Sequence, residues 1–296
     1  MRYLFIGSVE YSAHCLKALL EMNIDLAGIM CPKRHTSRIN SDYADLGTVA
    51  REYGRNAHYF ENIKDEADYV LDCKPDAIFV LGLSQIIPKN ILKIPTVGCI
   101  GSHLALLPYN RGRHPIIWTI ANGLTKCGVS LFWLDEGVDS GDIWTQKEFE
   151  IFSHDDARGV YKKATDLTID LLREKIPELK KGIITRVRQD AKKANYWRKR
   201  TPEDGEIDWR MSSKRIYDLV RALAKPYAGA HCVVSGKKIK VWKTKIIEGN
   251  NKLQNLEPGV VLKIEGDHIL VKTGDGVIEL AGHEFIHLPK KRDYLL

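Results

Sequence analysis

A histidine and an aspartate are the residues of this sequence whose types and positions best suit proton transfer. His103 follows the apolar segment 97–102, and Asp139 lies in Gly137-Val-Asp-Ser-Gly, after a second apolar segment. Because both segments are predicted strands, we expect the two side chains to lie at neighbouring strand ends as an acid–base pair. An imidazole has the pKa range needed to take a proton near neutral pH, and a nearby carboxylate stabilises its charged form.

The residues around this pair form a motif. Leu106-Leu-Pro and the basic segment Arg111-Gly-Arg follow His103, and Ser140-Gly follows Asp139. On these residues the chain resembles the formyltransferases that use 10-formyltetrahydrofolate, whose signature is Asn-x-His, then Leu-Leu-Pro-x-x-Arg-Gly, then Asp-[Ser/Thr/Gly]-Gly. The resemblance implies transfer of a formyl group from the folate to an amine, with His103 and Asp139 as the acid–base pair.

One position departs from that signature, because the family's asparagine falls on Gly101. Residues 101 and 103 share one face of a strand, so the glycine removes an amide beside His103. Formyl transfer passes through an oxyanion, and loss of one oxyanion donor typically costs about 2.7–4 kcal/mol of barrier. We expect Asn110 to supply the missing donor. His114, a backbone N–H or water are alternatives, and a slow or changed activity stays open.

The resemblance also implies where the substrates bind. The segment 81–88 is similar to the one that lines the pterin pocket in the family. The candidates for the folate pocket are Ser84, Gln85, Ile86, Leu134, Asp135 and Val138. Arg111 and Arg113 are expected to bind an anionic acceptor, because the arginine fork suits phosphate. No metal site is expected.

The family formylates methionyl-tRNA, glycinamide ribonucleotide and nucleotide-linked amino sugars. Where the tRNA enzymes usually carry a basic, glycine-containing loop, this chain has the segment 32–46, which begins Pro32-Lys-Arg-His. The segment ends in Ser41-Asp42-Tyr-Ala-Asp-Leu, which is similar to Ser-Asp-[Tyr/Phe]-x-Asp-Leu of the sugar enzymes. Ser41 and Asp42 are therefore acceptor-binding candidates. The resemblance favours a UDP- or dTDP-linked 4-amino-4,6-dideoxy sugar, with methionyl-tRNA as the runner-up. A non-catalytic folate or nucleotide binder, motivated by Gly101, is an alternative of another class.

The segments that carry these residues alternate between short apolar runs and helical periodicity. Apolar runs typical of strands cover 3–7, 26–30, 57–60, 76–81, 97–102, 127–134 and 143–149. Helical spacing covers 12–21, 43–53, 64–71, 114–122 and 156–172. Asp42 is expected to cap the second of these helices. The alternation predicts an open, mostly parallel α/β sheet of the Rossmann-like type.

The composition changes near residue 190. The polar, basic segment 190–208 predicts a linker between an N-terminal catalytic domain, 1–189, and a C-terminal domain, 209–296. In that second domain a helix at 214–224 precedes short strands at 230–234, 238–242, 259–264, 268–272 and 277–281. Short strands with glycine-containing turns predict a small β-barrel. The resemblance implies an OB-like barrel.

Composition narrows the class of protein further. The net charge of +7 over 296 residues is spread along the chain, as on a solvated surface, and does not favour a nucleic-acid-binding face. No apolar run approaches the roughly 20 residues that cross a bilayer, so we expect no membrane partner and a cytoplasmic location. The 6 cysteines lack metal-ligand spacing and are expected to be buried, reduced thiols. A homodimer is left open.

Overall fold

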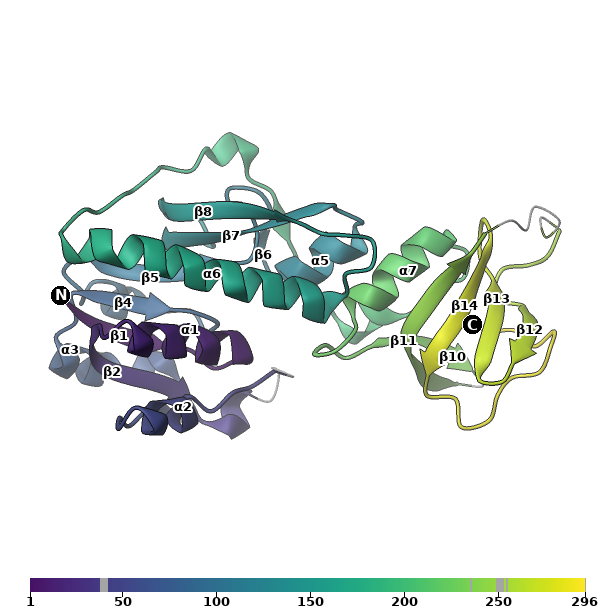
Figure 1. Ribbon diagram of the computed structural model, residues 1–296, viewed down its shortest axis with the longest axis horizontal. Coiled ribbons are helices and arrows are strands. Elements are labelled where there is room, and N and C mark those ends of the chain that lie inside the picture. Colours follow the sequence, from purple (N-terminus) through teal and green to yellow (C-terminus); the bar gives the residue numbers. More distant parts are fainter. Residues whose placement is uncertain (38–41, 235, 249–252, 254, 296) are drawn as a thin grey trace. The chain divides into compact units, whose positions relative to one another are not determined.

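The computed structural model describes residues 1–37, 42–234, 236–248, 253 and 255–295 (Figure 1). The chain forms two compact units, each made of several stretches of sequence. The first unit contains residues 1–115, 127–149 and 162–197, and the second contains 116–126, 150–161 and 198–296. The predicted boundaries at residues 189 and 209 stay a prediction.

The first unit is built on a mostly parallel sheet. Among the described residues seven strands lie in the order β3-β2-β1-β4-β5-β7-β8. Their bounds are β1 (Arg2–Ile6), β2 (Asp25–Pro32), β3 (His58–Phe60), β4 (Ala77–Val80), β5 (Gly98–His103), β7 (Lys126–Trp133) and β8 (Ile143–Glu150). The pairs from β3 to β5 are parallel, whereas β5 and β7 are antiparallel. The predicted α/β sheet is confirmed.

Both faces of the central strands β1 and β4 are buried, which explains their unbroken apolar runs, whereas the edge strand β8 is largely exposed. The helices are α1 (Glu10–Glu21), α2 (Leu46–Glu52), α3 (Ala67–Cys73), α4 (Lys89–Leu92), α5 (Pro115–Ala121) and α6 (Ala157–Lys180). On one face, Leu4 and Ile6 pack in a cluster with residues of α3 and α4. The alternate residues of β1 begin an aromatic row, in which Tyr3 stacks on Phe79 with ring centroids 5.5 Å apart.

Short 3₁₀ turns join several of these elements. Their bounds are Arg34–Ser37, Ile63–Asp65, Ala191–Lys193 and Pro202–Gly205. On the second face of the sheet, Tyr11 of α1 donates a hydrogen bond to Thr168 of α6 (3.1 Å). Figure 1 shows these two helices running along the sheet. The sheet is therefore covered on both sides, as in doubly wound folds.

The second predicted helix begins later than expected, so the prediction that Asp42 caps it was wrong. Helix α2 begins at Leu46, and the Asp45 carboxylate accepts the Gly47 N–H at 2.9 Å. The carbonyl of Asp42 accepts the Glu10 N–H at 2.9 Å, and Tyr43 forms a β-bridge with Val9. These backbone bonds hold residues 42–44 at the start of α1, which leaves the later acidic residue to cap the helix.

A two-stranded parallel pairing was not predicted. Strand β6 (Arg111–Gly112) lies in the loop after β5 and pairs with β9 (Tyr196–Trp197). Residues 196–197 belong to the segment that the composition predicted to be a linker. This pairing brings that segment to the loop that follows His103.

The second unit contains helix α7 (Ser213–Ala222) and an antiparallel sheet. Among the described residues five strands lie in the order β10-β11-β14-β13-β12. Their bounds are β10 (Ala230–Val234), β11 (Lys237–Ile247), β12 (Val261–Glu265), β13 (His268–Lys272) and β14 (Val277–His283). Each ladder is antiparallel. The sheet confirms the fold class, an α/β unit followed by a smaller β domain.

Two further expectations from composition can be compared with the structure. In the part of the chain that the structure describes, no helix has both the length and the apolar character to cross a membrane. Each cysteine is a buried free thiol. Burial raises the pKa of the Cys99 thiol to about 12, so it stays protonated at neutral pH. The expected burial of the cysteines is confirmed.

Candidate active site

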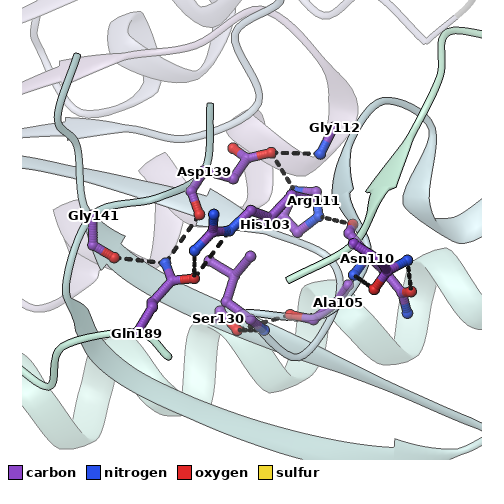
Figure 2. A network of polar contacts seen from close by, with 11 residues as sticks. His103, Ala105, Asn110, Arg111, Gly112, Ser130, Asp139, Gly141 and Gln189 are labelled. Carbon is purple, nitrogen blue, oxygen red and sulfur yellow. Dashed lines mark hydrogen bonds and ion pairs between the residues drawn. The ribbon is translucent and has the colours of Figure 1, made fainter. Parts of the chain in front are cut away.

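His103 ends β5 and is almost completely buried between two acceptor groups (Figure 2). Its Nε2 lies 2.7 Å from the backbone carbonyl oxygen of Asn110, and its Nδ1 lies 3.6 Å from Oδ2 of Asp139. The buried Ser130 on β7 shapes the loop between these residues. Its hydroxyl donates to the Ala105 carbonyl (2.7 Å) and accepts the Leu107 N–H (3.0 Å).

The contacts of His103 assign its neutral tautomer. A carbonyl oxygen only accepts, so Nε2 carries the hydrogen and Nδ1 carries the lone pair. That lone pair faces Asp139 at 3.6 Å, which is longer than a hydrogen bond. The structure therefore brings the predicted pair together, with the lone pair of the neutral ring on Nδ1. Once Nδ1 is protonated, the carboxylate lies within ion-pair distance of it.

The loop that carries Asp139 is held by its own backbone and by Gln189. Asp139 has a left-handed backbone with φ 51°, and its Oδ2 accepts the Gly112 N–H at 2.8 Å. Nε2 of Gln189 donates to the carbonyls of Asp139 (2.9 Å) and Gly141 (2.6 Å). A Cβ at Gly141 would lie 1.7 Å from the Trp133 carbonyl oxygen, so only glycine fits there. The carboxylate is thus held by contacts on both sides.

Arg111 is buried in the same network and does not face solvent. Its Nε and Nη2 donate to Oε1 of Gln189 (3.2 and 2.7 Å), and its Nη1 donates to the Tyr196 hydroxyl (2.8 Å). Only 4% of this arginine is exposed, whereas Arg113 is exposed. Acceptor binding by either arginine stays a prediction, and the geometry favours Arg113 for it.

Asn110 has a left-handed backbone with φ 60° and is held by the side chain of Asn195. Oδ1 of Asn195 accepts the Asn110 N–H at 2.8 Å, and Nδ2 of Asn195 donates to Oδ1 of Asn110 at 3.0 Å. Asn110 therefore reaches His103 through its backbone carbonyl. Its expected role as an oxyanion donor rests on the remaining amide nitrogen and stays a prediction, as does the alternative at His114.

Leu134 occupies the place beside Gly101. A Cβ at residue 101 would lie 2.5 Å from Cδ2 of Leu134 and 3.4 Å from the ring of Phe132. The register pairs Gly101 with Phe132 and His103 with Ser130, so Gly101 and His103 do share a face. In this chain an apolar side chain thus fills the space in which the family signature has an amide.

The two loops predicted to line the folate pocket are joined by an ion pair. Nζ of Lys89 lies 2.7 Å from Oε1 of Glu136. Each loop carries an exposed apolar side chain, Ile86 at 84% and Val138 at 56%. Two flexible apolar side chains on joined loops can enclose a flat ring.

The other folate-pocket candidates have varied surroundings. The side chain of Gln85 bonds the backbone of Ile63 (2.8 Å) and Glu61 (2.9 Å), and that of Asp135 accepts from Gly137 (3.0 Å) and Ser140 (2.9 Å). Ser84 is exposed. The Gln85 and Asp135 side chains thus shape their loops, which leaves backbone groups to read a ligand.

Of the two residues in the loop after β2 that were predicted to bind the acceptor substrate, the structure describes only one. Ser41 lies outside the described residues, and Asp42 is half-buried. Two basic side chains of the same loop contact one carboxylate: Lys33 lies 3.1 Å and His35 lies 3.6 Å from Oε1 of Glu61. This pairing reduces the positive charge that the loop presents.

Sequence reasoning missed three residues of the network, Gln189, Asn195 and Tyr196. All three lie in or beside the predicted linker. The adjacent aromatic residues Tyr196 and Trp197 are typical of a strand and were the available signal. No periodicity could extend over two residues, so the segment resembled a linker.

Comparisons with known proteins identify the family of this chain. The Formyl transferase family model matches residues 30–176, and the Formyl transferase, C-terminal domain, model matches residues 199–290. The methionyl-tRNA formyltransferase of Caldanaerobacter subterraneus subsp. tengcongensis is 32% identical, over 95% of this chain and 91% of that protein. The methionyl-tRNA formyltransferase of Caldicellulosiruptor saccharolyticus is 33% identical over the same shares.

Solved structures share the fold at lower identity. WlaRD, a sugar 3N-formyl transferase, is similar with a TM-score of 0.71 and 18% identity, over 97% of this chain and 99% of that one. A structure of HypX from Aquifex aeolicus is similar with a TM-score of 0.69 and 20% identity over 96% of this chain, which spans 45% of HypX. From the sequence relatives and the two matching domain families, this chain belongs to the formyltransferase family of enzymes.

Proposed function

We propose that this enzyme transfers a formyl group from 10-formyltetrahydrofolate to the amine of a nucleotide-linked amino sugar. The observation that carries the proposal is the buried His103, whose Nδ1 lone pair faces the Asp139 carboxylate at 3.6 Å. The two groups can receive and stabilise the proton that an amine loses when it attacks a carbonyl carbon.

The reaction needs one proton to move from the acceptor amine to the folate nitrogen. As the amine nitrogen bonds to the formyl carbon, Nδ1 of His103 takes the proton that the nitrogen sheds. Asp139 stabilises the resulting imidazolium, and the Asn110 carbonyl keeps its hydrogen bond to Nε2. When the bond between the formyl carbon and the folate nitrogen breaks, the imidazolium returns a proton to that nitrogen. Atoms and charges balance without another reactant.

The formyl donor fits the loops that join at Lys89 and Glu136. Ile86 and Val138 supply the apolar surface for a flat pterin ring, and the backbone of the same loops supplies polar groups. The WlaRD structure was determined in the presence of 5-N-formyl-THF, and one HypX structure is a complex with tetrahydrofolic acid. These structures support the same ligand class here.

For the acceptor we propose a UDP- or dTDP-linked 4-amino-4,6-dideoxy sugar. The loop after β2 supports this choice, because Ser41-Asp42-Tyr-Ala-Asp-Leu is similar to the loop of the sugar enzymes. Glu61 also offsets the charge of Lys33 in this loop. Structural neighbours support the class of nucleotide-linked amino sugars, since one is in complex with dTDP-3-aminofucose. The position of the amine on the sugar rests on the similarity of the loop sequence alone.

Methionyl-tRNA is the second candidate acceptor, because the sequence relatives at 29–33% identity have that activity in their names. The two acceptors differ in the number of phosphates that the protein neutralises. A nucleotide sugar offers two phosphates, whereas a tRNA backbone offers many and gives a steep dependence of affinity on salt.

The test combines a substrate panel with a salt series. The pure protein is incubated with 10-formyltetrahydrofolate and either nucleotide amino sugars or methionyl-tRNA, and release of tetrahydrofolate is measured. We expect turnover with a sugar and a KM that changes little with salt. Tight, steeply salt-dependent binding of tRNA with turnover would establish the second candidate. Folate binding without turnover on any amine would identify a non-catalytic binder.

A further inference from the structure

The segment 189–197, which we name the brace, contacts both partners of His103. Figure 2 shows Gln189, the first residue of the brace, beside Asp139. At one end of the brace, Gln189 bonds the carbonyls of the Asp139 loop. At the other end, Asn195 bonds Asn110, whose carbonyl reaches His103. The pairing of β9 with β6 fixes the register between them. The brace is therefore placed to set the environment of both imidazole nitrogens.

The two bonds from Asn195 constrain the carbonyl that faces His103. A left-handed backbone such as that of Asn110 is uncommon outside glycine and needs support from its surroundings. Asn195 provides that support with an acceptor for the backbone N–H and a donor for the side-chain oxygen. The peptide that follows Asn110 is also held by the Arg111 N–H, which donates to the backbone carbonyl of Asn195 at 3.0 Å in any Asn195 variant. Loss of the two side-chain bonds therefore leaves the Asn110 carbonyl supported from one side, and we expect its hydrogen bond to Nε2 to weaken.

The Asn110 carbonyl decides which imidazole nitrogen acts as the base. While the carbonyl accepts from Nε2, the lone pair stays on Nδ1, beside Asp139. Without it, the carboxylate would attract a hydrogen onto Nδ1, because an ionised carboxylate only accepts. The lone pair would then move to Nε2, on the side of the ring away from Asp139.

We propose that Asn195 is a positioning residue that holds His103 in the tautomer with hydrogen on Nε2. The proposal rests on the proposed function, because the tautomer matters for turnover only if His103 is the base. Asn195 touches no reacting atom in this scheme and acts through the Asn110 carbonyl. Gln189 does the corresponding work for the Asp139 loop.

The experiment compares Asn195→Ala, which loses both bonds, with Asn195→Asp, which keeps an acceptor for the Asn110 N–H. Lys193→Ala is the matched control, because this exposed brace residue has only a 4.0 Å ion pair with Asp190. Histidine-labelled ¹⁵N spectra give the protonation of each ring nitrogen, and the signals missing in His103→Gln assign His103. Thermal unfolding confirms that each variant is folded.

We expect the parent and Lys193→Ala to carry hydrogen on Nε2, and Asn195→Ala to show a mixture or the other tautomer. Its kcat should fall about ten- to a hundredfold, part of what general base catalysis contributes, with KM nearly constant. The kcat and the tautomer ratio of Asn195→Asp should lie between those of the parent and of Asn195→Ala. An unchanged tautomer in both variants would overturn the proposal. The spectra answer this question even if no amine is formylated, so a failure of the proposed function is recognised separately.

Discussion

Residue 101 is glycine where the family signature has asparagine, and the side chain of Leu134 fills the space beside it. The sequence alone identified the missing asparagine, because the motif around it is otherwise intact. It could not identify the filler, since Leu134 is distant in sequence and reaches residue 101 only through the pairing of β5 with β7. An asparagine at residue 101 therefore requires the Leu134 side chain to move.

We predict that Gly101→Asn destabilises the protein by about 1–3 kcal/mol, the usual cost of overpacking a core. The added Cβ would lie 2.5 Å from Leu134, whose side chain must move. Gly101→Asn combined with Leu134→Ala makes room and should recover part of that loss. Urea unfolding of the two variants and of Leu134→Ala measures the coupling. Full stability of Gly101→Asn alone would show that Leu134 yields without cost.

His103 and Asp139 are predicted to act on the proton and not on folate affinity. His103→Ala should lower kcat by about 10²–10⁴, the usual contribution of a general base. Asp139→Asn is the matched change there, because asparagine tolerates the left-handed backbone and still accepts the Gly112 N–H. Both variants should bind the folate with nearly unchanged Kd, measured by fluorescence or calorimetry. Equal losses of affinity and rate would contradict these roles.

His231 on β10 is predicted to make the second unit sensitive to acid. Among the described residues neither of its ring nitrogens has a hydrogen-bond partner, and only 2% of it is exposed. Burial, followed by the nearby Lys238 and Lys240, lowers its pKa from the ordinary value of 6.5, against the raising effect of Glu206 at 3.7 Å. The unfolded chain thus takes up this proton at a higher pH than the folded chain.

Because the pKa of His231 is lower in the folded chain than in the unfolded chain, acid destabilises the fold. Stability is fully present above pH 6.5 and falls as the pH decreases toward the lower pKa of the folded state. Unfolding midpoints measured from pH 7.5 down to about pH 5 should show this slope, and His231→Gln should reduce it. Hydrogen bonds hold the pKa values of Asp208 and Asp275 below the ordinary 3.8, so the stability that these carboxylates provide is constant across this range and is lost only at lower pH. An unchanged slope in His231→Gln would rule the residue out.

At the scale of elements, hydrophobic periodicity predicted the longer strands and helices, whose patterns extend over several residues. The strand at His268–Lys272 has the predicted bounds, and the strand that ends at His103 differs by one residue at each end. Errors occurred where few residues decide the outcome. Two acidic residues compete for the start of α2, and the two-residue strands β6 and β9 pair over a long separation in sequence. Such contacts depend on tertiary structure, which periodicity does not encode.

Whether Asp45 or Asp42 caps α2 can be tested by substitution. Asp45→Ala should destabilise the first unit by about 1 kcal/mol, the typical cost of a lost N-cap. It also removes the acceptor of the Tyr59 hydroxyl, which lies 2.6 Å from Oδ1 of Asp45. Asp45→Asn keeps the cap and is the matched control. Thermal unfolding of both variants and of Asp42→Ala provides the comparison. A larger loss of stability in Asp42→Ala than in Asp45→Ala would show that Asp42 is the cap, as predicted from the sequence.

At the scale of the whole molecule, the second unit is not continuous in sequence. It includes residues 116–126 and 150–161 besides 198–296. Helix α7 uses these stretches: Nη1 of Arg221 donates to the Asp155 carbonyl (2.7 Å), and the Tyr217 hydroxyl donates to the Ser153 carbonyl (2.9 Å). Arg221 is buried with Asp218, at 2.8 Å, so the removal of residues 150–161 would expose an ion pair formed in the interior.

This discontinuity limits how members of the family can exchange parts by recombination. A chimera that takes residues 198–296 from a relative packs the relative's α7 against residues 150–161 of this chain, whose Ser153 and Asp155 carbonyls accept from Tyr217 and Arg221 here. A crossover that moves 116–126 and 150–161 together with 198–296 preserves the whole unit and leaves the brace with the catalytic sheet. Crossovers near residue 190, where the composition changes, would separate the brace from the histidine it serves. Crossovers that keep the protein folded are therefore expected to follow the boundaries of the packed units and not the order of segments along the chain.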